Sequence, residues 1–499
     1  MLLLLVLAVA LVLFTLDWEM VGMAAVKEGG GEGGQREGKA KKERANLLVG
    51  DVHGDLVYAL DFLGALKFLN SHGVVVDDAY FTDCMADTNF FRAYTDPKCL
   101  LFWMHKLAFN PPRRIDMVLG VMTREEEVAL GKDAADKPMS NGGMRVTLAD
   151  TRTQGYWKPC TLDTGHMETY VTEITSFVLD RLLGFCHTPP VVPRFFTSVE
   201  LNTLATMAQA TSAEWGDEEA LRKVESVVRL CGQEEDRDSF QVAGAEGAMV
   251  GWSPFKVKNM YSKKRQKDKF FKFEEIETVE QLEEARAEFF NVTRAQQHTK
   301  EGKQAAVKAV EVLAVHMYAM VVGNLHKFDH NLFAAVSKDG RTTGPFVYID
   351  NDRSQWRWKF YRTKWIKEGI NPMARFCKFP SRIAHRILFY RTANSANNQG
   401  ITLGRLMLSL EQEGVYENFI NGPIWTERES VVLDANIDYM AAMIEHCVKV
   451  HGEEEVFLDE TWQQPEDYPS FAELLREVGL HDRPNAIDAV EQLQLATKK

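Results

Sequence analysis

Positive charge is scarce in this sequence compared with negative charge: 58 Lys and Arg stand against 71 Asp and Glu, a formal net charge of -13. Because general nucleic-acid binding needs a basic face, this balance argues against it. Cysteine is also scarce, and seven in 499 residues are too few for a disulfide scaffold. Their odd number leaves at least one thiol outside any intrachain pair. With 45% hydrophobic and 26% charged residues, the composition is that of a globular protein and excludes wholesale disorder.

Charge is likewise missing from the N-terminal segment. Residues 2–16 are almost unbroken apolar residues, no basic residue precedes them, and Asp17 follows. The run is short for a bilayer span and typical of the hydrophobic region of a signal peptide. We therefore expect residues 1–16 to be a signal peptide or signal anchor, with a buried apolar element as the alternative. Residues 17–46, rich in Gly, Glu, Lys and Arg, are expected to form a flexible stem.

The rest of the chain divides into a part with strand patterns and a mostly helical part. A helix is predicted over residues 47–72, a hairpin within residues 140–160, and a helix over residues 168–183 that ends at Gly184. After a connector with several prolines, the periodicity predicts helices over residues 307–322, 373–392, 401–413 and 430–451. This order indicates an α+β fold with a first lobe at residues 47–195, a second lobe at residues 196–465 and a C-terminal appendage at residues 466–499. A cleft between two such lobes is a natural ligand site.

Two polar segments in the second part carry a pattern typical of a phosphate-and-metal site. Asn331 directly precedes one short apolar run, and Asp350 ends another, Phe346–Ile349. An amide oxygen and a carboxylate are hard ligands of the kind that Mg²⁺ or Mn²⁺ takes when it carries a nucleotide. A kinase catalytic hairpin has the same layout, in which a base precedes an Asn and a strand ends at a metal-binding Asp. Five residues before Asn331, where a kinase has its base, this chain has His326.

A lysine and a glutamate in the first part complete this pattern. Lys158 ends the apparent strand Gly155–Lys158, and Glu173 lies among apolar residues of the following predicted helix. A lysine in that position can direct one positive charge at nucleotide phosphates, and a glutamate can orient it. Two surface charges on neighbouring elements would be the ordinary alternative. Together with Asn331 and Asp350, however, the four residues occur in the chain order that a kinase requires.

Two other metal sites are alternatives. His326, Asp329 and His330 form a His-x-x-Asp-His pattern that is conceivable for zinc, although nearby Cys or His partners at zinc-finger spacing are absent. The segment Gly50–Asp55, with Asp51 and His53 after an apolar run, resembles the first metal motif of calcineurin-type metallophosphoesterases. That fold needs further metal-binding turns, for which the chain offers only the degenerate segment Thr82–Asp87.

The run Glu173–Phe185, followed by Thr188–Val192, resembles the Golgi casein kinase and four-jointed family of secretory-pathway kinases. Members of that family carry a Glu-Ile-x-x-Phe-x-Leu-Asp-Arg helix and then a Pro-Pro-Val connector, both present here. Their Asp-Asn-Gly-Arg turn is similar to Asp350–Arg353. Cys377 and Cys447 are similar to a pair of cysteines that form a disulfide in the second lobe of the family. The resemblance covers roughly residues 140–450, the span of one kinase-like domain.

This resemblance implies a two-lobed protein-kinase-like fold that binds ATP together with Mg²⁺ or Mn²⁺. By the same resemblance, Lys158 is the nucleotide lysine and Glu173 is its helix partner. Asn331 and Asp350 correspond to the metal ligands. Asn291, in an Asn-Val-Thr sequon, would carry a glycan if it is exposed in the lumen.

The resemblance also implies ATP-dependent phosphoryl transfer to a hydroxyl of a secreted protein or glycan. We expect the protein in the Golgi lumen, either secreted or as a single-pass type II protein that meets the membrane only through its N-terminal segment. The catalytic Asp of the family falls on His326, and Lys327 replaces the Arg that follows it. Either His326, whose ordinary pKa is near neutral, or Asp329 is then the candidate catalytic base. Alternatively, the protein is a nucleotide-binding pseudokinase that acts as the scaffold or activator of a kinase partner.

Overall fold

The structure is a computed structural model, and the residues it describes all belong to one compact unit, Val52–Lys499. The N-terminal apolar segment, the stem, the helix expected over residues 47–72 and the segment Gly50–Asp55 lie outside the described residues. Within the described part of the chain, no helix is long and apolar enough to cross a membrane. The described residues are 77–86, 92–119, 143–150, 152–159, 169–211, 232–234, 242–252, 257–259, 280, 284, 287, 300–323, 332–336, 343–349, 351, 376–391, 402–412 and 425–458.

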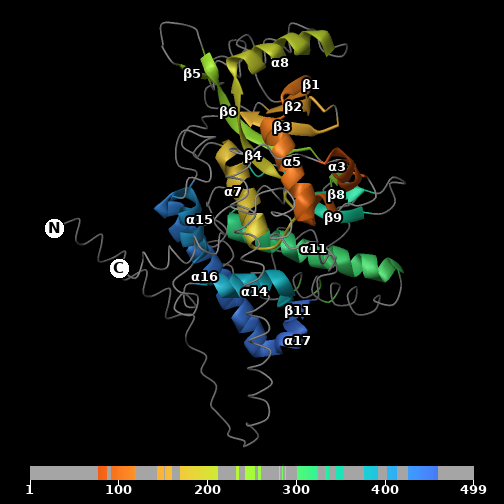
Figure 1. Cartoon of the computed structure of the whole chain (residues 1–499). Helices are drawn as coiled ribbons and strands as arrows, with labels where there is room; N and C mark the ends of the chain where they lie inside the picture. Colours follow the sequence, from red (N-terminus) through yellow and green to blue (C-terminus); the bar gives the residue numbers. More distant parts are fainter. Residues whose placement is uncertain are drawn as a thin grey trace, which may run out of the picture. The chain divides into compact units, whose positions relative to one another are not determined.

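An antiparallel six-stranded sheet forms the first lobe, at the top of the view in Figure 1. The hairpin expected within residues 140–160 is confirmed, because β2 and β3 pair antiparallel. Its turn is set by Asp150, whose carboxylate accepts hydrogen bonds from the backbone N–H groups of Arg152 and Thr153. Along the sheet the strands are β1 (Pro112–Leu119), β2 (Gly143–Leu148), β3 (Gln154–Pro159), β6 (Val242–Gly251) and β4 (Val191–Thr197), with β5 (Gly232–Glu234) beside β6.

The boundary expected at residue 195 falls inside β4. β6 pairs with both β3 and β4, so the sheet, and with it the first lobe, continues to Gly251. Sequence patterns miss this strand because Val242–Gly251 consists largely of Gly and Ala, which are depleted in strands. The helix α8 (Ser198–Thr211), which lies between β4 and β6 in the sequence, also belongs to the first lobe and contacts β1.

Two helices cover opposite faces of the sheet. A Cβ on Gly155 of β3 would meet Leu107 of α5 (Pro97–Phe109), so this face of the strand points to α5. Side chains alternate along a strand, and Lys158 therefore points to the other face, where α7 (Thr169–Leu182) lies. The helix expected over residues 168–183 is thus confirmed, and it packs against the sheet on the side of Lys158.

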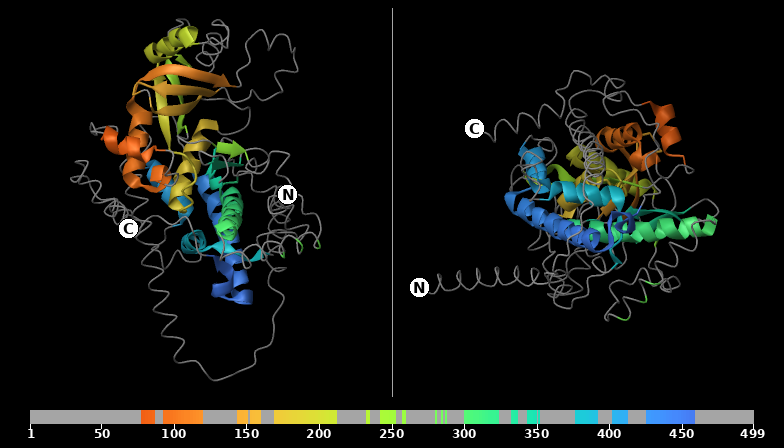
Figure 2. Two further views of the ribbon diagram at one scale, coloured as in Figure 1. Left: turned by 90° about the vertical axis from the view of Figure 1, so that its right-hand side faces the viewer. Right: turned by 90° about the horizontal axis from the view of Figure 1, so that it is seen from below.

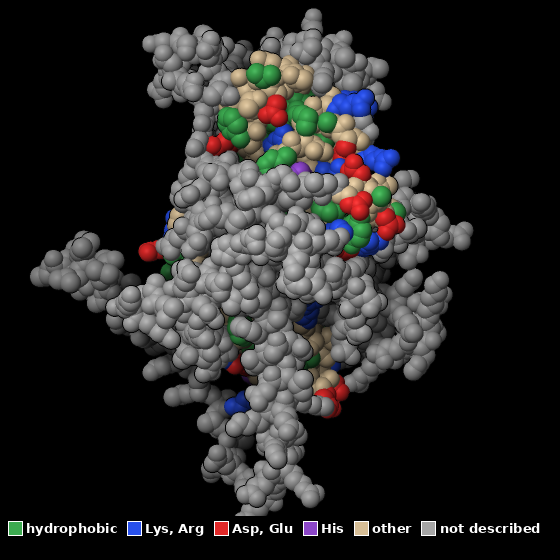
Figure 3. Space-filling view, viewed as in Figure 1, with side chains coloured by type: hydrophobic (Ala, Val, Ile, Leu, Met, Phe, Trp, Pro, Cys, Tyr) green, Lys and Arg blue, Asp and Glu red, His purple; other side chains and the backbone are tan. Residues whose placement is uncertain are grey.

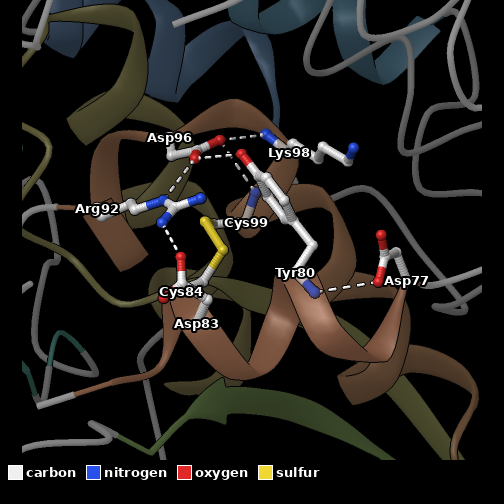
Figure 4. Close-up of a disulfide and its surroundings, with 8 residues drawn as sticks. All are labelled: Asp77, Tyr80, Asp83, Cys84, Arg92, Asp96, Lys98 and Cys99. Atoms are coloured by element: carbon white, nitrogen blue, oxygen red, sulfur yellow. Dashed lines mark hydrogen bonds and ion pairs between the residues drawn. A yellow bond between two sulfur atoms is a disulfide. The ribbon is translucent and has the colours of Figure 1, made fainter.

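A disulfide ties the short helix α3 (Asp78–Cys84) to the start of α5 (Figure 4). Cys84 and Cys99 form this bond, and Asp96 lies beside it. One oxygen of Asp96 accepts the backbone N–H groups of Lys98 and Cys99 and caps α5. This pair could not be predicted from the sequence, because cysteine connectivity cannot be deduced from spacing alone.

The second lobe is mainly helical, and in the left view of Figure 2 its green and blue helices lie below the orange and yellow sheet. A second disulfide joins Cys377, just before β10 (Phe379–Pro380), to Cys447 on α16 (Glu427–His451). These are the two cysteines that the family resemblance pairs. The described elements of the second lobe are β7 (Val257–Asn259), α11 (Lys300–Val322), β8 (Leu332–Val336), β9 (Thr343–Tyr348), β10 (Phe379–Pro380), α14 (Ser381–Tyr390), α15 (Leu403–Gln412), α16 (Glu427–His451), α17 (Glu453–Val456) and β11 (Phe457–Leu458).

The four helices expected in this lobe are present, and one of them is shorter than expected. α14 begins at Ser381 rather than near residue 373, because Phe379 and Pro380 pair with β11 as a short parallel strand. The buried apolar side chains of both lobes form one cluster. On the face shown in Figure 3, the described acidic and basic side chains are interspersed rather than gathered by sign.

Candidate functional site

Lys158 and Glu173 meet inside the first lobe. The ammonium nitrogen of Lys158 lies 2.5 Å from Oε1 of Glu173. Both residues are buried, with 5% of Lys158 and 0% of Glu173 exposed to solvent. A charge pair this deeply buried costs much more free energy to break than a pair on the surface, because removing either partner leaves the other charge buried and uncompensated. The ordinary alternative of two surface charges is therefore wrong.

The position of Glu173 follows from where α7 begins and ends. Gly184 has a φ of +76°, its N–H donates to the carbonyl of Arg181, and the N–H of Phe185 donates to the carbonyl of Asp180. These two bonds form a Schellman motif, which needs a residue in the left-handed conformation after the helix. Glycine adopts that conformation without strain, so the sequence fixes the end of α7 at this residue. The helix then presents Glu173 to the sheet.

The turn after β9 joins this pair from the second lobe. The main-chain N–H of Asn351 donates to Oε1 of Glu173 at 2.7 Å, and Asn351 is completely buried. The same carboxylate oxygen therefore binds the lysine of the first lobe and the residue that directly follows Asp350 in the sequence. This contact links the lysine–glutamate pair to the segment that follows β9.

The remaining predicted site residues lie outside the described residues: His326, Asp329, Asn331 and Asp350, and with them the sequon residue Asn291. Their roles stay predictions. The strands on either side of them are described, and β8 and β9 pair antiparallel with Leu332 opposite Tyr348. The start of β8 and the end of β9 therefore lie at the same end of this hairpin. In the sequence, Asn331 directly precedes Leu332, and Asp350 follows Tyr348 by two residues.

The second half of the family-like helix motif shapes the connector between helix and sheet. Asp180 is fully buried, and one of its oxygens accepts the backbone N–H groups of His187 and Thr188. Burial raises the pKa of Asp180 to about 6, against the lowering effect of Arg181 and these hydrogen bonds. The guanidinium of Arg181 in turn donates to the carbonyls of Tyr94 and Thr188. Sequence reasoning assigned these two residues no role beyond the motif itself.

The connector is also joined to the second lobe. The backbone N–H of Tyr348 donates to the carbonyl of His187 at 3.0 Å. The imidazole of His187 lies 3.4 Å from the carboxylate of Glu311 on α11, but burial lowers the pKa of His187 to about 3. The ring is therefore neutral at physiological pH, and this contact is not an ion pair. Glu311 meanwhile accepts the backbone N–H of Phe346, which fixes β9 against α11.

The segment Thr82–Asp87, considered above as a degenerate second metal motif of a phosphoesterase, gives that interpretation no support where it is described. Asp83 and Cys84 end the helix α3, where Asp83 is paired with Arg92 and Cys84 is in a disulfide. A metal-binding turn would follow a strand, whereas these two residues end a helix. Of the described residues, only Cys84, Asp96 and Cys99 form a group with metal-ligand chemistry. Their two sulfurs are bonded to each other, and both oxygens of Asp96 accept hydrogen bonds.

The described part of the site fits a nucleotide held by its phosphates. The Lys158 ammonium is a donor of the kind that binds phosphate oxygens, and Glu173 accepts one of its hydrogen bonds. Lys158 lies opposite Ala248 of β6, so its cross-strand neighbour there has a small side chain. If Asn331 and Asp350 hold a divalent cation, their hard oxygen donors suit Mg²⁺ or Mn²⁺ better than a soft metal.

No protein-family model matches the chain, and no curated protein matches it by sequence. Among solved structures it is similar to "hydra Fam20 with sugar", with 16% identity over 75% of this chain and 94% of that one and a TM-score of 0.41. It is also similar to "the Golgi casein kinase with Mn/ADP bound", at 14% identity, 78% and 85% coverage and a TM-score of 0.44. A second Golgi casein kinase structure gives 13% identity, 79% and 89% coverage and a TM-score of 0.42.

These structural neighbours are of the family that the sequence resembles. At such identities, and at TM-scores below 0.5, the likeness adds no argument about activity. The contacts of Lys158, Glu173 and Asn351 have to carry that argument.

Proposed function

We propose that this protein is a secretory-pathway kinase-like protein that binds ATP with Mg²⁺ or Mn²⁺ between its two lobes. One observation carries the proposal. A single buried carboxylate oxygen, Oε1 of Glu173, accepts the Lys158 ammonium at 2.5 Å and the N–H of Asn351 at 2.7 Å. A lysine–glutamate pair next to a metal-binding acidic turn is the arrangement that phosphoryl transfer by kinases requires.

Each predicted residue then has a defined task. Lys158 contacts the nucleotide phosphates, and Glu173 holds its side chain in the orientation that this contact needs. Asn331 and Asp350 supply the hard oxygen ligands of the divalent cation. The cation neutralises negative charge on the phosphates when it is bound. Catalysis of this kind depends mainly on positioning and on charge, so the identity of the base affects the rate more than the binding.

The acceptor that we propose is a hydroxyl group of a secreted protein or a glycan. The two disulfides of the described residues, Cys84–Cys99 and Cys377–Cys447, support a location in an oxidising compartment, because such bonds are rare in reducing ones. The apolar residues 2–16 are the matching targeting signal. A Golgi-lumen location, with membrane contact only through this segment, follows as part of the proposal.

A nucleotide-binding pseudokinase is the second candidate function, and His326 at the position of the base favours it. In that case the protein acts as the scaffold or activator of a kinase partner. A histidine can still accept a hydroxyl proton near neutral pH, and Asp329 lies three residues further along the chain. The two candidates share the nucleotide site and differ only in turnover.

Mass spectrometry of phosphoryl transfer from ATP, with Mn²⁺ and with casein-like peptides or simple glycans as acceptors, tests the enzyme. Wild-type turnover that is lost in Asp329→Asn and kept in His326→Ala would assign the base to Asp329. The reverse pattern would assign it to His326. No turnover in the wild type, with turnover restored by His326→Asp, would establish the pseudokinase. Nucleotide binding without metal dependence in all these variants would refute both candidates.

A further inference from the structure

Asn351 makes more contacts than a residue that only follows a metal ligand needs. It is completely buried, and its main-chain N–H binds Glu173. Its side-chain amide nitrogen donates to the carbonyl of Tyr348 at 3.1 Å, which closes the turn after β9. Its side-chain oxygen lies 3.3 Å from the hydroxyl of Tyr318, on α11. The side chain therefore fixes the turn at two points, while the backbone of the same residue contacts the lysine–glutamate pair.

The hydroxyl of Tyr318 lies where three segments meet. Besides Asn351, it has the carbonyl of Ser176 on α7 within 3.4 Å, and the hydroxyl of Thr188 in the connector within 3.5 Å. The ring is fully buried and packs edge-on against Phe185. Burial raises the pKa of Tyr318 well above its ordinary value, so the hydroxyl keeps its proton and remains a donor.

We propose that Asn351 and Tyr318 form an interlobe latch that positions Glu173 and, through Glu173, Lys158. This latch deepens the proposed function, because it assigns two positioning residues to the same nucleotide site. Without the two side-chain contacts of Asn351, its main-chain N–H is no longer held in position beside Glu173. The Glu173 carboxylate then loses the hydrogen bond that orients its Oε1 toward Lys158. An amide side chain fits this task, because it offers both a donor for the carbonyl of Tyr348 and an acceptor for the hydroxyl of Tyr318.

The latch also explains how the pair is assembled in the protein without ligand. Helix α7 is held to the second lobe in its middle by Tyr318 and at its end by Arg386 of α14, which donates to the carbonyls of Arg181 and Leu182. A helix held at two places cannot move relative to the second lobe, and so relative to the N–H of Asn351, without breaking these contacts. We expect the site to be pre-organised, so that nucleotide binding needs no partner to bring Glu173 toward Lys158.

The test compares Asn351→Ala and Tyr318→Phe with the wild type of the full chain. The matched control is Ser430→Ala, which also removes a buried polar side chain with two carbonyl acceptors, on α16 at the contact with α15. The first readout is the affinity for ADP with Mn²⁺. The second readout needs no nucleotide: it is the rate at which an amine-reactive acylating reagent modifies Lys158, measured for that residue by mass spectrometry.

We expect Asn351→Ala to weaken Mn²⁺–ADP binding about tenfold, the equivalent of one lost charge-assisted hydrogen bond, and to speed acylation of Lys158 several-fold. Tyr318→Phe changes both in the same direction by about threefold, because it loses only the neutral contact. Ser430→Ala lowers the melting temperature without changing either readout.

The two readouts separate the latch from the proposed function. If the wild type does not bind Mn²⁺–ADP, the proposed function fails, and the acylation rates alone decide on the latch. Acylation of Lys158 at the wild-type rate in Asn351→Ala overturns the latch, even if nucleotide binds. Loss of nucleotide affinity in Ser430→Ala to the same degree would show a general stability effect and would also overturn it.

Discussion

Separating Lys158 from Glu173 should be costly, and removing both together should not. Lys158→Met leaves a buried carboxylate whose Oε1 keeps, among the described residues, only the N–H of Asn351 as a hydrogen-bond donor. Glu173→Gln leaves a buried ammonium, 5% exposed, beside a neutral amide. Breaking a buried pair by removing one partner costs about 3–5 kcal/mol, whereas replacing both partners by neutral groups is often close to neutral. The loss of unfolding free energy in the double variant should therefore be smaller, by at least about 2 kcal/mol, than the sum of the losses in the two single variants.

The free energy of unfolding in urea measures all four members of this cycle. The pair between Arg391 and Glu445 is a matched surface control, because half of the Glu445 side chain is exposed. Glu445→Gln should cost less than about 1 kcal/mol. Additive losses in the Lys158–Glu173 cycle, or losses as small as those of the control, would refute the buried coupling.

Three further changes act on the supports of the site. Cys377→Ser together with Cys447→Ser should lower the free energy of unfolding by about 4 kcal/mol, since the bond closes a loop with a sequence separation of 70; unchanged stability of this double variant would contradict the prediction. Gly184→Ala should cost about 1–2 kcal/mol or more in urea unfolding, because φ is +76° and the new Cβ would meet Arg386; an unchanged midpoint would contradict the proposed cap. The pKa of Asp180 is about 6 in the folded protein and 3.8 in the unfolded chain, so the folded state binds the proton more tightly. The contribution of this proton to the free energy of unfolding is therefore greatest below pH 4 and is lost as the pH rises to 6. Asp180→Asn keeps the acceptor oxygen and should be more stable than the wild type above pH 6, with the difference shrinking toward pH 4; a difference independent of pH would refute this.

Local signals predicted the elements around the site well. The turn chemistry of Asp150 fixed the hairpin that carries Lys158, and Gly184 marked the end of the helix that carries Glu173. Each of these signals acts within a few residues of the chain, through a side-chain hydrogen bond or a positive φ. The pairing of Lys158 with Glu173 could be inferred as well. The local pattern alone did not indicate it, but the order of the four candidate residues along the chain did.

Contacts between distant segments were not predictable in the same way. Nothing in the sequence around Asn351 indicates that its N–H reaches Glu173, 178 residues earlier. The strand Val242–Gly251 was missed because its small residues carry no strand signal, although it lies between two other strands of the sheet. Pairing within a sheet depends on the partner strand as much as on the strand itself, which a single sequence does not display.

Calorimetric titration of ADP into the wild type and Asp350→Ala, each with and without Mn²⁺, tests the central claim most directly. The contacts of Glu173 with Lys158 and Asn351 predict binding to the wild type that requires the metal. They also predict that Asp350→Ala, folded by its circular dichroism, abolishes that binding. A folded wild type that binds no nucleotide in the presence of Mn²⁺, or an Asp350→Ala variant that binds it unchanged, would contradict the account.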